Sequence, residues 1–244
     1  MWPFSRKRSL GESGIFRGGT DWHTHILPGV DDGVRTMEEA LEILSLYEKL
    51  GVKVVWFTPH VMEDVPNTTS GLKGRFDELK AAYKGGIDLH LAAEYMLDNL
   101  FCERLENGDL LPLGEKEDLL LVETSCYNPP ANLYRLLDKI KSNGFHPVLA
   151  HPERYMYLDK GGYERLKAGG IRFQLNLFSL TGLYGKEARI KAGWLSGKGY
   201  YNMAGTDTHG TEMLRGGLAG SKAGPYGIIL ANFLTEFLTV AEIF

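Results

Sequence analysis

Cysteine is scarce in this sequence, which has only Cys102 and Cys126 among 244 residues. A framework of disulfides is therefore excluded, and two lone cysteines are typical of reduced thiols in a cytoplasmic protein. Position 108, six residues after the first cysteine, is glycine, and position 132, six residues after the second, is asparagine. Neither cysteine therefore begins a phosphate-binding loop of the usual Cys-to-Arg spacing.

Long runs of Lys or Arg are also absent, and the formal net charge is −4. Because proteins that bind nucleic acid usually carry a basic face, we expect no nucleic-acid partner. No internal repeat, linker or low-complexity stretch divides the chain. Apolar residues make up 43% and charged residues 24%, which is typical of a soluble globular protein, and we interpret the sequence as one domain.

A secretory signal is missing as well. The N-terminal stretch "MWPFSRKRSLGESG" contains basic residues, but no apolar segment follows them. We expect residues 1–19 to form a mobile or surface-docked arm.

One long apolar stretch, "GIILANFLTEFLTVAEIF" at residues 227–244, raises the question of a membrane span. A glutamate near the middle of a span would cost about 2.5–3.5 kcal/mol on insertion scales. We expect residues 216–244 to form an amphipathic helical segment, packed on the domain or on a second subunit of a homo-oligomer, and membrane contact is the disfavoured alternative. The polar residues follow one stripe at helical spacing: Asn232, Thr235, Glu236, Thr239 and Glu242.

What the sequence does contain is an alternation of short apolar runs with helical patterns. Thr36 and Glu39 have the spacing of a capping box, which predicts a helix that ends at Gly51. Alternation of this kind is typical of parallel strands joined by crossover helices, as in an α/β barrel. Further helical patterns cover residues 70–86, which two glycines close, 130–143 and 185–197.

Most of the apolar runs end on a side chain that can bind a metal. In a parallel barrel the C-terminal ends of the strands meet at one rim, so these side chains should lie close in space. His90 and His146 do not end a run, and we interpret them as ordinary structural residues. The residues at the ends of the runs are His60, Glu94, Glu123, His151, Asp207 and His209.

The segment "TDWHTHILPGVDDG" at residues 20–33 adds two histidines and two aspartates. His23 and His25 are two apart in a predicted strand, so both imidazoles point to the same side. Imidazoles and carboxylates are the usual ligands of first-row divalent metals. Their repetition at strand ends predicts a metal site.

These residues lie in motifs that resemble the PHP superfamily, the polymerase and histidinol phosphatase domain: "HTH", "LPGVDDG", "TPH", "AAE", "VETS", "LAHPERY" and "GTDTH". Their order and spacing are most similar to those of the bacterial tyrosine-protein phosphatases that accompany capsule and exopolysaccharide synthesis. The resemblance covers about residues 20–215, which would be the phosphatase domain. It implies a distorted (β/α)7 TIM-like barrel with three divalent metal ions, manganese in the first place, with iron or zinc as alternatives.

The resemblance also implies the ligands, residue by residue. Asp32 matches the family's second aspartate before the glycine, and Asp31 is then interpreted as a turn residue. The first metal would be bound by His23, His25, Glu94 and Asp207, the second by Asp32, His60 and His209, and the third by Glu94, Glu123 and His151.

Two arginines complete the expected site. Arg154 follows His151 by three residues, and a guanidinium suits two phosphate oxygens at once. The alternative for Arg154 is an ion pair with Glu153. Arg215 occupies about the place of another phosphate-binding arginine of the family, although the local sequence "GTEMLRGGLAG" departs from the family pattern.

The leading hypothesis is a metal-dependent tyrosine phosphatase that uses metal-activated hydroxide, because neighbouring ions lower the pKa of a bridging water. Its substrate would be a phosphotyrosine-bearing protein, such as a bacterial tyrosine kinase of polysaccharide synthesis. A small-molecule phosphatase, for instance one acting on histidinol phosphate, or an exonuclease is the alternative among enzymes. The third alternative is a metal-bearing, non-catalytic interaction module, which the complete ligand set disfavours.

Overall fold

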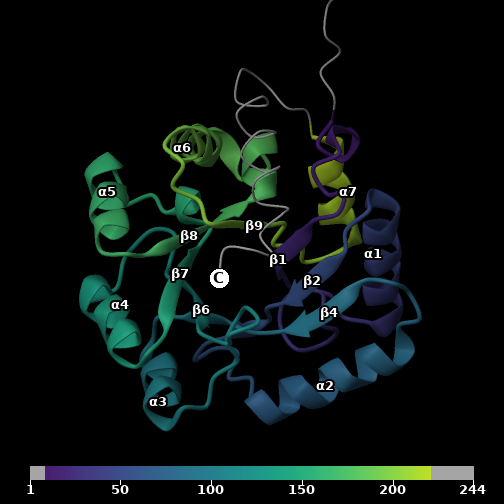
Figure 1. Cartoon of the computed structure of the whole chain (residues 1–244), viewed down its shortest axis with the longest axis horizontal. Coiled ribbons are helices and arrows are strands. Elements are labelled where there is room, and N and C mark those ends of the chain that lie inside the picture. The colour runs from purple at the N-terminus through teal and green to yellow at the C-terminus, as the bar shows by residue number, and fades with distance from the viewer. Residues whose placement is uncertain (1–8, 221–244) are drawn as a thin grey trace, which may run out of the picture.

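The structure, a computed structural model, describes residues 9–220, in which helices surround parallel strands (Figure 1). Strands and helices alternate along the chain, as the sequence predicts. The strands are β1 Thr20–Thr24, β2 Val54–Phe57, β3 His60–Val61, β4 Asp88–Leu91, β5 Glu94–Met96, β6 Leu119–Glu123, β7 His146–Ala150, β8 Arg172–Asn176 and β9 Met203–Gly205. The helices are α1 Met37–Leu50, α2 Thr69–Ala82, α3 Asn99–Asn107, α4 Leu133–Ser142, α5 Lys160–Ala168, α6 Gly185–Gly197 and α7 Thr211–Ala219, with short 3-10 turns at Gly11–Ser13, Pro152–Arg154 and Leu177–Thr181.

The strands form two sheets in which every pairing is parallel. One sheet has the order β1-β2-β4, and the other has the order β3-β5-β6-β7-β8-β9. A small inner core contains residues of both sheets, among them Trp56 of β2, Leu121 of β6 and Val148 of β7. The prediction of an α/β fold with parallel strands is therefore confirmed.

Two breaks in the strands place His60 and Glu94. The sequence predicts that both residues end long strands, but β2 stops at Phe57 and β4 stops at Leu91, and each residue begins a short strand. Pro59 explains the first break, because a proline has no N–H to donate to the ladder. Its carbonyl accepts a hydrogen bond from the Glu94 N–H at 3.1 Å, and His60 and Glu94 are then paired in register.

Backbone hydrogen bonds connect the first strand to the end of the last. The His25 N–H donates to the Thr208 carbonyl at 2.9 Å, and the Asp207 N–H donates to the His23 carbonyl at 2.8 Å. The two histidines of the first strand are thereby held beside Asp207, although about 180 residues separate them in the sequence.

A buried aspartate reinforces this contact from the helical side. Both carboxylate oxygens of Asp21 accept from Thr206, one from its N–H at 2.9 Å and the other from its hydroxyl at 2.8 Å. The Tyr47 hydroxyl, which comes from α1, donates to Asp21 at 2.8 Å. Burial raises the pKa of Asp21, and these hydrogen bonds oppose the rise. The network joins β1, α1 and the segment after β9.

Local signals placed the helices well. Thr36 is the N-cap of α1 and its side chain accepts from the Glu39 N–H, while Gly51 closes the helix in the left-handed conformation, so both predictions are confirmed. The helix predicted over residues 185–197 is α6. By contrast, α2 ends at Ala82, before the two glycines that were expected to close it.

The ends of the predicted domain are described only in part. Leu10 and Phe16 of the N-terminal arm are buried, and the Leu10 N–H donates to the Gly220 carbonyl at 2.9 Å, so this part of the arm is docked. Most of the segment predicted at 216–244 lies outside the described residues, and α7 runs across its expected start. Within residues 9–220, no helix is long and apolar enough to cross a membrane.

Gly205 allows the close approach of β9 to β1, which yields a stability prediction. A Cβ at this position would lie 2.5 Å from the His23 Cβ and 2.6 Å from the His23 nitrogen. We expect Gly205→Ala to lower the free energy of unfolding by about 1–3 kcal/mol, because the strand must shift to relieve the overlap. Urea denaturation in the presence of a chelator measures this without a contribution from bound metal.

Gly74→Ala is the matched control. A Cβ at Gly74 meets nothing within 4 Å, and this glycine lies inside α2. The same chemical change should there raise the free energy of unfolding by about 0.5–1 kcal/mol. Equal effects at the two positions would contradict the close approach at Gly205.

Candidate metal centre

The structure brings all nine predicted ligands together. Their ligand atoms form four groups, and within each group the atoms lie within 4.8 Å of one another. The groups are His25, Asp32, His60 and His209; His23, His25 and Asp207; His23, Glu94 and His151; and His60, Glu94 and Glu123.

Glu94 is the centre of this cluster. Its Oε2 lies 3.2 Å from His23 Nε2, from His25 Nε2 and from His60 Nδ1. Its Oε1 lies 3.1 Å from His151 Nε2. A single buried carboxylate thus faces four imidazoles, which is the placement that a ligand bridging two metal ions requires.

Asp207 faces the cluster with one oxygen and the protein with the other. Its Oδ1 lies 3.4 Å from His23 Nε2 and 3.3 Å from His25 Nε2. Its Oδ2 accepts from Arg154 Nη1 at 2.7 Å and from Asn176 Nδ2 at 3.1 Å. This carboxylate therefore couples the cluster to an arginine at its edge.

Asp32 and Glu123 lie at two edges of the cluster. The Oδ1 of Asp32 is 3.6 Å from Nε2 of both His60 and His209, and its side chain is 73% exposed. Glu123 approaches His60 Nδ1 to 3.1 Å and His151 Nε2 to 3.9 Å. The cluster is therefore open to solvent at Asp32.

Asp31 has a second role that the sequence reasoning missed. Its Oδ1 accepts from the Gly33 N–H at 3.0 Å, as a turn residue does, but its Oδ2 accepts from His25 Nδ1 at 2.8 Å and from the His60 N–H at 3.0 Å. An acceptor at Nδ1 keeps the proton there and leaves Nε2 free as a ligand atom. The signal in the sequence was the presence of two adjacent aspartates, of which only Asp32 had been assigned to the cluster.

Gln174 does the same for the neighbouring histidine, and it was also missed. Its Oε1 lies 3.0 Å from His23 Nδ1 and accepts from the His151 N–H at 3.1 Å. The glutamine is fully buried in β8. A polar residue inside the apolar run "IRFQLN" was the only sign of this role.

The donor set fits a cation. With both Nδ1 atoms facing acceptors, the Nε2 atoms of His23 and His25 face each other at 3.0 Å, next to the carboxylates of Glu94 and Asp207. Two lone pairs at this distance repel unless a positive charge lies between them. His60 Nδ1 and Glu94 Oε2 are also buried without a hydrogen bond of proper geometry, although they lie 3.2 Å apart. Orphaned groups of this kind are satisfied by a bound ion.

The pKa values of the histidines report the same need for positive charge. Burial lowers the pKa of His23, but the charges of Glu94 and Asp207 outweigh burial and raise it to about 9. Burial lowers the pKa of His60 too, but the neighbouring carboxylates of Glu123 and Glu94 outweigh burial and raise it to about 10. Burial and the neighbouring His25 lower the pKa of His209 to about 4. Positive charge is therefore favoured at His23 and His60, whereas the low pKa of His209 favours its neutral imidazole, the form that binds a metal.

Backbone strain is found at two members of the cluster. His151 has φ 32° and Asp207 has φ 54°, both in the left-handed region that disfavours residues with a Cβ. Such conformations persist where the surrounding structure imposes them, and they gather at functional sites.

Arg154 lies at the edge of the cluster. Its expected alternative partner, Glu153, is instead buried and accepts from the Tyr201 hydroxyl at 2.9 Å, so the loop ion pair between them does not form. Arg154 pairs with Asp207 at 2.7 Å, and its guanidinium lies 4.4 Å from the ring centroid of Tyr184. About a quarter of its side chain is exposed, at 26%.

Arg215 and Cys126 lie differently. Arg215 is on α7, and 57% of its side chain is exposed. Its guanidinium pairs with Glu42 of α1 at 2.9 Å and not with a carboxylate of the cluster.

Cys126 is a free thiol whose pKa is raised by burial. A raised thiol pKa disfavours the nucleophilic thiolate.

The chain is similar in sequence to known tyrosine-protein phosphatases. Over 176 residues the chain is 28% identical to the putative tyrosine-protein phosphatase CapC of Staphylococcus aureus, covering 69% of this chain and 68% of that protein. Over 207 residues it is 25% identical to the tyrosine-protein phosphatase YwqE of Bacillus subtilis, covering 79% and 78%.

A solved structure shares the fold. It comes from work on YwqE of Bacillus subtilis and CpsB of Streptococcus pneumoniae, described as metal-dependent tyrosine phosphatases, and it matches with a TM-score of 0.73 at 21% identity, over 90% of this chain and 94% of that one. The sequence model of the CpsB/CapC family of capsular polysaccharide synthesis matches residues 19–220. The chain therefore belongs to the CpsB/CapC family of capsular polysaccharide synthesis.

Proposed function

We propose that this protein is a metal-dependent phosphatase that hydrolyses phosphotyrosine in a protein substrate. The observation that carries the proposal is the buried cluster around Glu94, open at Asp32 and bordered by Arg154. The relatives named tyrosine-protein phosphatases supply the substrate class. The substrate would be a phosphorylated tyrosine kinase of polysaccharide synthesis, and the two free thiols suit a cytoplasmic location.

The finer architecture belongs to the same proposal. If β2 with β3 and β4 with β5 each count as one interrupted strand, the strands make a distorted (β/α)7 barrel. The bonds between His25 and Thr208 and between His23 and Asp207 support closure of that barrel. We take residues 20–215 as the phosphatase domain, with α7 extending beyond it.

Three divalent ions, manganese in the first place, are proposed for the cluster. Imidazole and carboxylate ligands suit manganese, and iron or zinc are the alternatives. Following the family resemblance, we assign His23, His25, Glu94 and Asp207 to the first ion, Asp32, His60 and His209 to the second, and Glu94, Glu123 and His151 to the third. The four groups of neighbouring ligand atoms overlap these sets, but they also place His25 with the second set and His60 with Glu94 and Glu123.

When bound, such ions supply Lewis-acid stabilisation of the phosphoryl oxygens and lower the pKa of water. The chain's own residues then position the reactants. Asp31 and Gln174 fix the ring orientation of His25 and His23 through Nδ1. Arg154 uses Nη1 to bind Asp207, which leaves its other N–H groups to bind the phosphoryl group where negative charge develops.

The decisive assay compares turnover of a phosphotyrosine peptide with turnover of histidinol phosphate, both with added manganese. A tyrosine phosphatase should favour the peptide. Preference for histidinol phosphate would assign the protein to the small-molecule phosphatases, and lack of turnover of either by the fully metallated protein would favour the interaction module.

Elemental analysis of the manganese-loaded protein should give three ions per chain. Asp32→Ala is expected to reduce the count to two, because Asp32 is the exposed ligand of the second ion and its loss leaves the buried core intact. The control is Asp64→Ala, which removes an exposed carboxylate elsewhere. An unchanged count in Asp32→Ala would overturn the assignment of that ligand.

Activity should vanish on prolonged chelation and return with manganese, since no protein nucleophile is involved. Cys126→Ser should keep most of the wild-type kcat/KM, because the raised pKa of the thiol makes it a poor nucleophile. Steady-state kinetics with metal content recorded for each sample provide the measurement. A folded, metallated Cys126→Ser without activity would reverse the assignment.

Arg154→Ala should lower kcat/KM by about 10²–10³, the usual loss for one preorganised charged donor. Arg154→Lys should recover only part, because a point charge cannot replace the guanidinium fork. Arg215→Ala is the comparison: we expect a smaller loss, because that guanidinium pairs with Glu42. Wild-type kinetics in a fully metallated Arg154→Ala would show that Arg154 only forms an ion pair with Asp207.

A further inference from the structure

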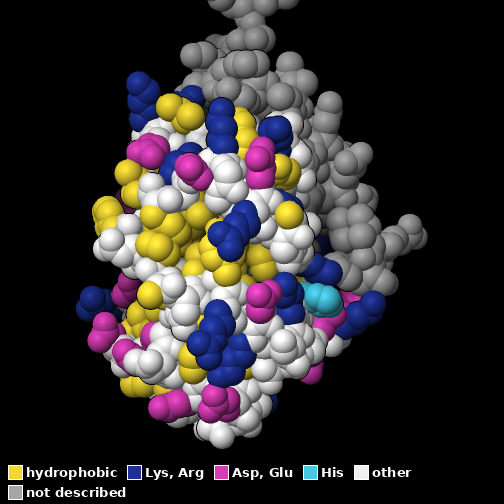
Figure 2. Space-filling model, turned by 90° about the vertical axis from the view of Figure 1, so that its left-hand side faces the viewer, with side chains coloured by type: hydrophobic (Ala, Val, Ile, Leu, Met, Phe, Trp, Pro, Cys, Tyr) yellow, Lys and Arg dark blue, Asp and Glu magenta, His cyan; other side chains and the backbone are white. Residues whose placement is uncertain are grey.

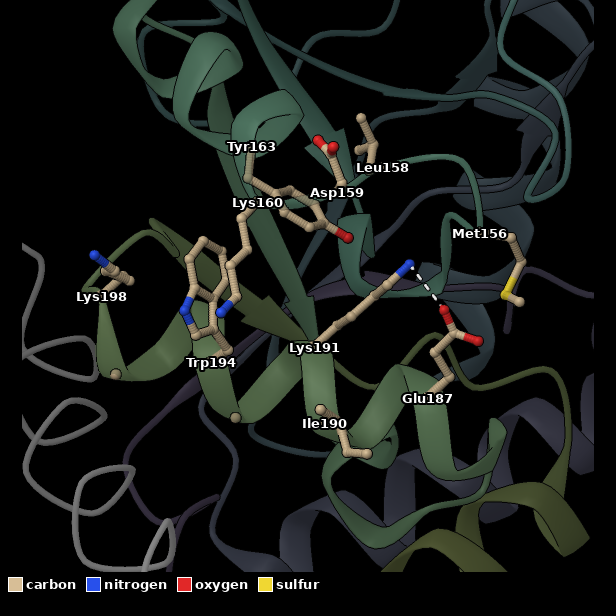
Figure 3. Close-up of a pocket in the computed structure, with 12 residues that line it drawn as sticks. Met156, Leu158, Asp159, Lys160, Tyr163, Glu187, Ile190, Lys191, Trp194 and Lys198 are labelled. Carbon is tan, nitrogen blue, oxygen red and sulfur yellow. Dashed lines mark ion pairs between the residues drawn. The ribbon is translucent and has the colours of Figure 1, made fainter.

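A groove runs along α6 beside the loop that carries Arg154 (Figure 3). Its volume is about 730 Å³, and it lies between α6 and the segment from Met156 to Tyr163. Met156 and Ile190 are 50% and 59% exposed on its walls. We call it the α6 groove, with Met156, Lys160, Lys191, Ile190, Trp194 and Lys198 as the lining residues that matter here.

One end of the α6 groove adjoins the candidate metal centre. Met156 is two residues after Arg154, so their Cα atoms are at most about 7 Å apart. Tyr184, whose ring lies under the Arg154 guanidinium, is the N-cap of α6, and Glu187 of the groove follows it by three residues. A polypeptide bound at Arg154 can therefore continue directly into the groove.

The other end combines an aromatic ring with positive charge. The ammonium groups of Lys160 and Lys198 lie 5.6 Å and 5.7 Å from the ring centroid of Trp194. Both lysines are exposed, and within residues 9–220 neither has a carboxylate at ion-pair distance, whereas Lys191 pairs with Glu187 at 3.4 Å. Figure 2 shows hydrophobic side chains gathered on this side of the molecule with Lys and Arg side chains among them.

We propose that the α6 groove binds the part of the substrate polypeptide that flanks its phosphotyrosine, and that it selects a flank with an apolar residue and acidic residues. The inference rests on the proposed function. Apolar side chains of the flank would cover Met156 and Ile190, and its carboxylates would meet Lys160 and Lys198. At about 3.3 Å per residue, positions two to four residues from the phosphotyrosine reach Met156 and Ile190. Trp194 and Lys198 lie about 15 and 21 Å along α6 from Tyr184, so positions about five to seven reach the two lysines.

The test uses three kinds of substrate with the manganese-loaded full chain. Two peptides carry a leucine two to four residues and two glutamates five to seven residues from the phosphotyrosine, one on its N-terminal side and one on its C-terminal side. A third peptide carries alanine and glutamine in their place, and free phosphotyrosine has no flank. We expect wild-type kcat/KM to be higher for at least one acidic peptide than for the neutral one, and the preference to weaken as salt screens it.

Lys160→Glu with Lys198→Glu reverses both exposed charges of the groove without touching the cluster. The double variant should lower kcat/KM for the preferred acidic peptide about three- to thirtyfold, mainly through KM, because two surface ion pairs are lost and two repulsions are introduced. Its kcat/KM on free phosphotyrosine should stay at the wild-type value. Ile190→Ser should lower kcat/KM for the same acidic peptide and leave kcat/KM for the neutral peptide unchanged.

Lys53→Glu with Lys73→Glu is the matched control, since both lysines are exposed and neither lines the groove. It makes the same change in net charge and should leave all kinetic constants unchanged. Equal losses of kcat/KM for the acidic peptide in the two double variants would show that the net charge of the protein, and not contact in the groove, sets the preference. That result would overturn the proposal.

Two further results would also overturn it. Hydrolysis of phosphotyrosine with no peptide preference, and no effect of the groove variants, would leave the proposed function intact and refute the groove's role. A change of oligomeric state in Lys160→Glu with Lys198→Glu, measured by light scattering, with unchanged kinetics, would assign the groove to a second copy of the chain. Absence of phosphotyrosine hydrolysis in every sample would instead refute the proposed function.

Discussion

The meeting of Glu94 with four imidazoles is the interaction on which the rest of the structure depends. A buried carboxylate surrounded by His23, His25, His60 and His151 is favourable only if positive charge is supplied, since burial by itself penalises every charged form. The raised pKa values of His23 and His60 show that the isolated chain draws protons to this place. Bound metal ions would supply the same positive charge and would add Lewis acidity. The group that stabilises the buried Glu94 carboxylate would then also be the group that activates the substrate.

Holding this cluster requires close backbone approaches. The Cβ-free Gly205 lets β9 lie against His23, and the left-handed His151 and Asp207 turn their side chains inward from the ends of their strands. Asp21 then ties β1 to α1 and to Thr206 through buried hydrogen bonds. Each of these features fixes the backbone next to a residue of the cluster. The side chains of the cluster are therefore held in place by the surrounding structure.

A chain of contacts connects the cluster to the surface outside it. Asp207 binds the histidine side with one oxygen and Arg154 with the other, so the proposed phosphate-binding group is positioned by the same carboxylate that contributes to the cluster. Arg154 in turn packs on Tyr184 at the start of α6, the helix that forms one wall of the groove. One short loop thereby connects the buried cluster to the groove that we propose for the substrate chain.

The sequence by itself determined the alternation of strands and helices, the cap at Thr36, and which histidines and acids can bind a metal, because periodicity, capping and ligand chemistry are local properties. It did not determine that His60 and Glu94 begin short strands and do not end long ones. Resemblance of the motifs to a family then predicted the ligand set. Only the tertiary structure decided that Asp31 and Gln174 hold the Nδ1 atoms of His25 and His23, and that Arg154 pairs with Asp207 and not with Glu153. These contacts join residues up to 151 positions apart. They depend on register, on strand breaks such as the one at Pro59 and on the approach of β9 to β1, none of which a local pattern can encode.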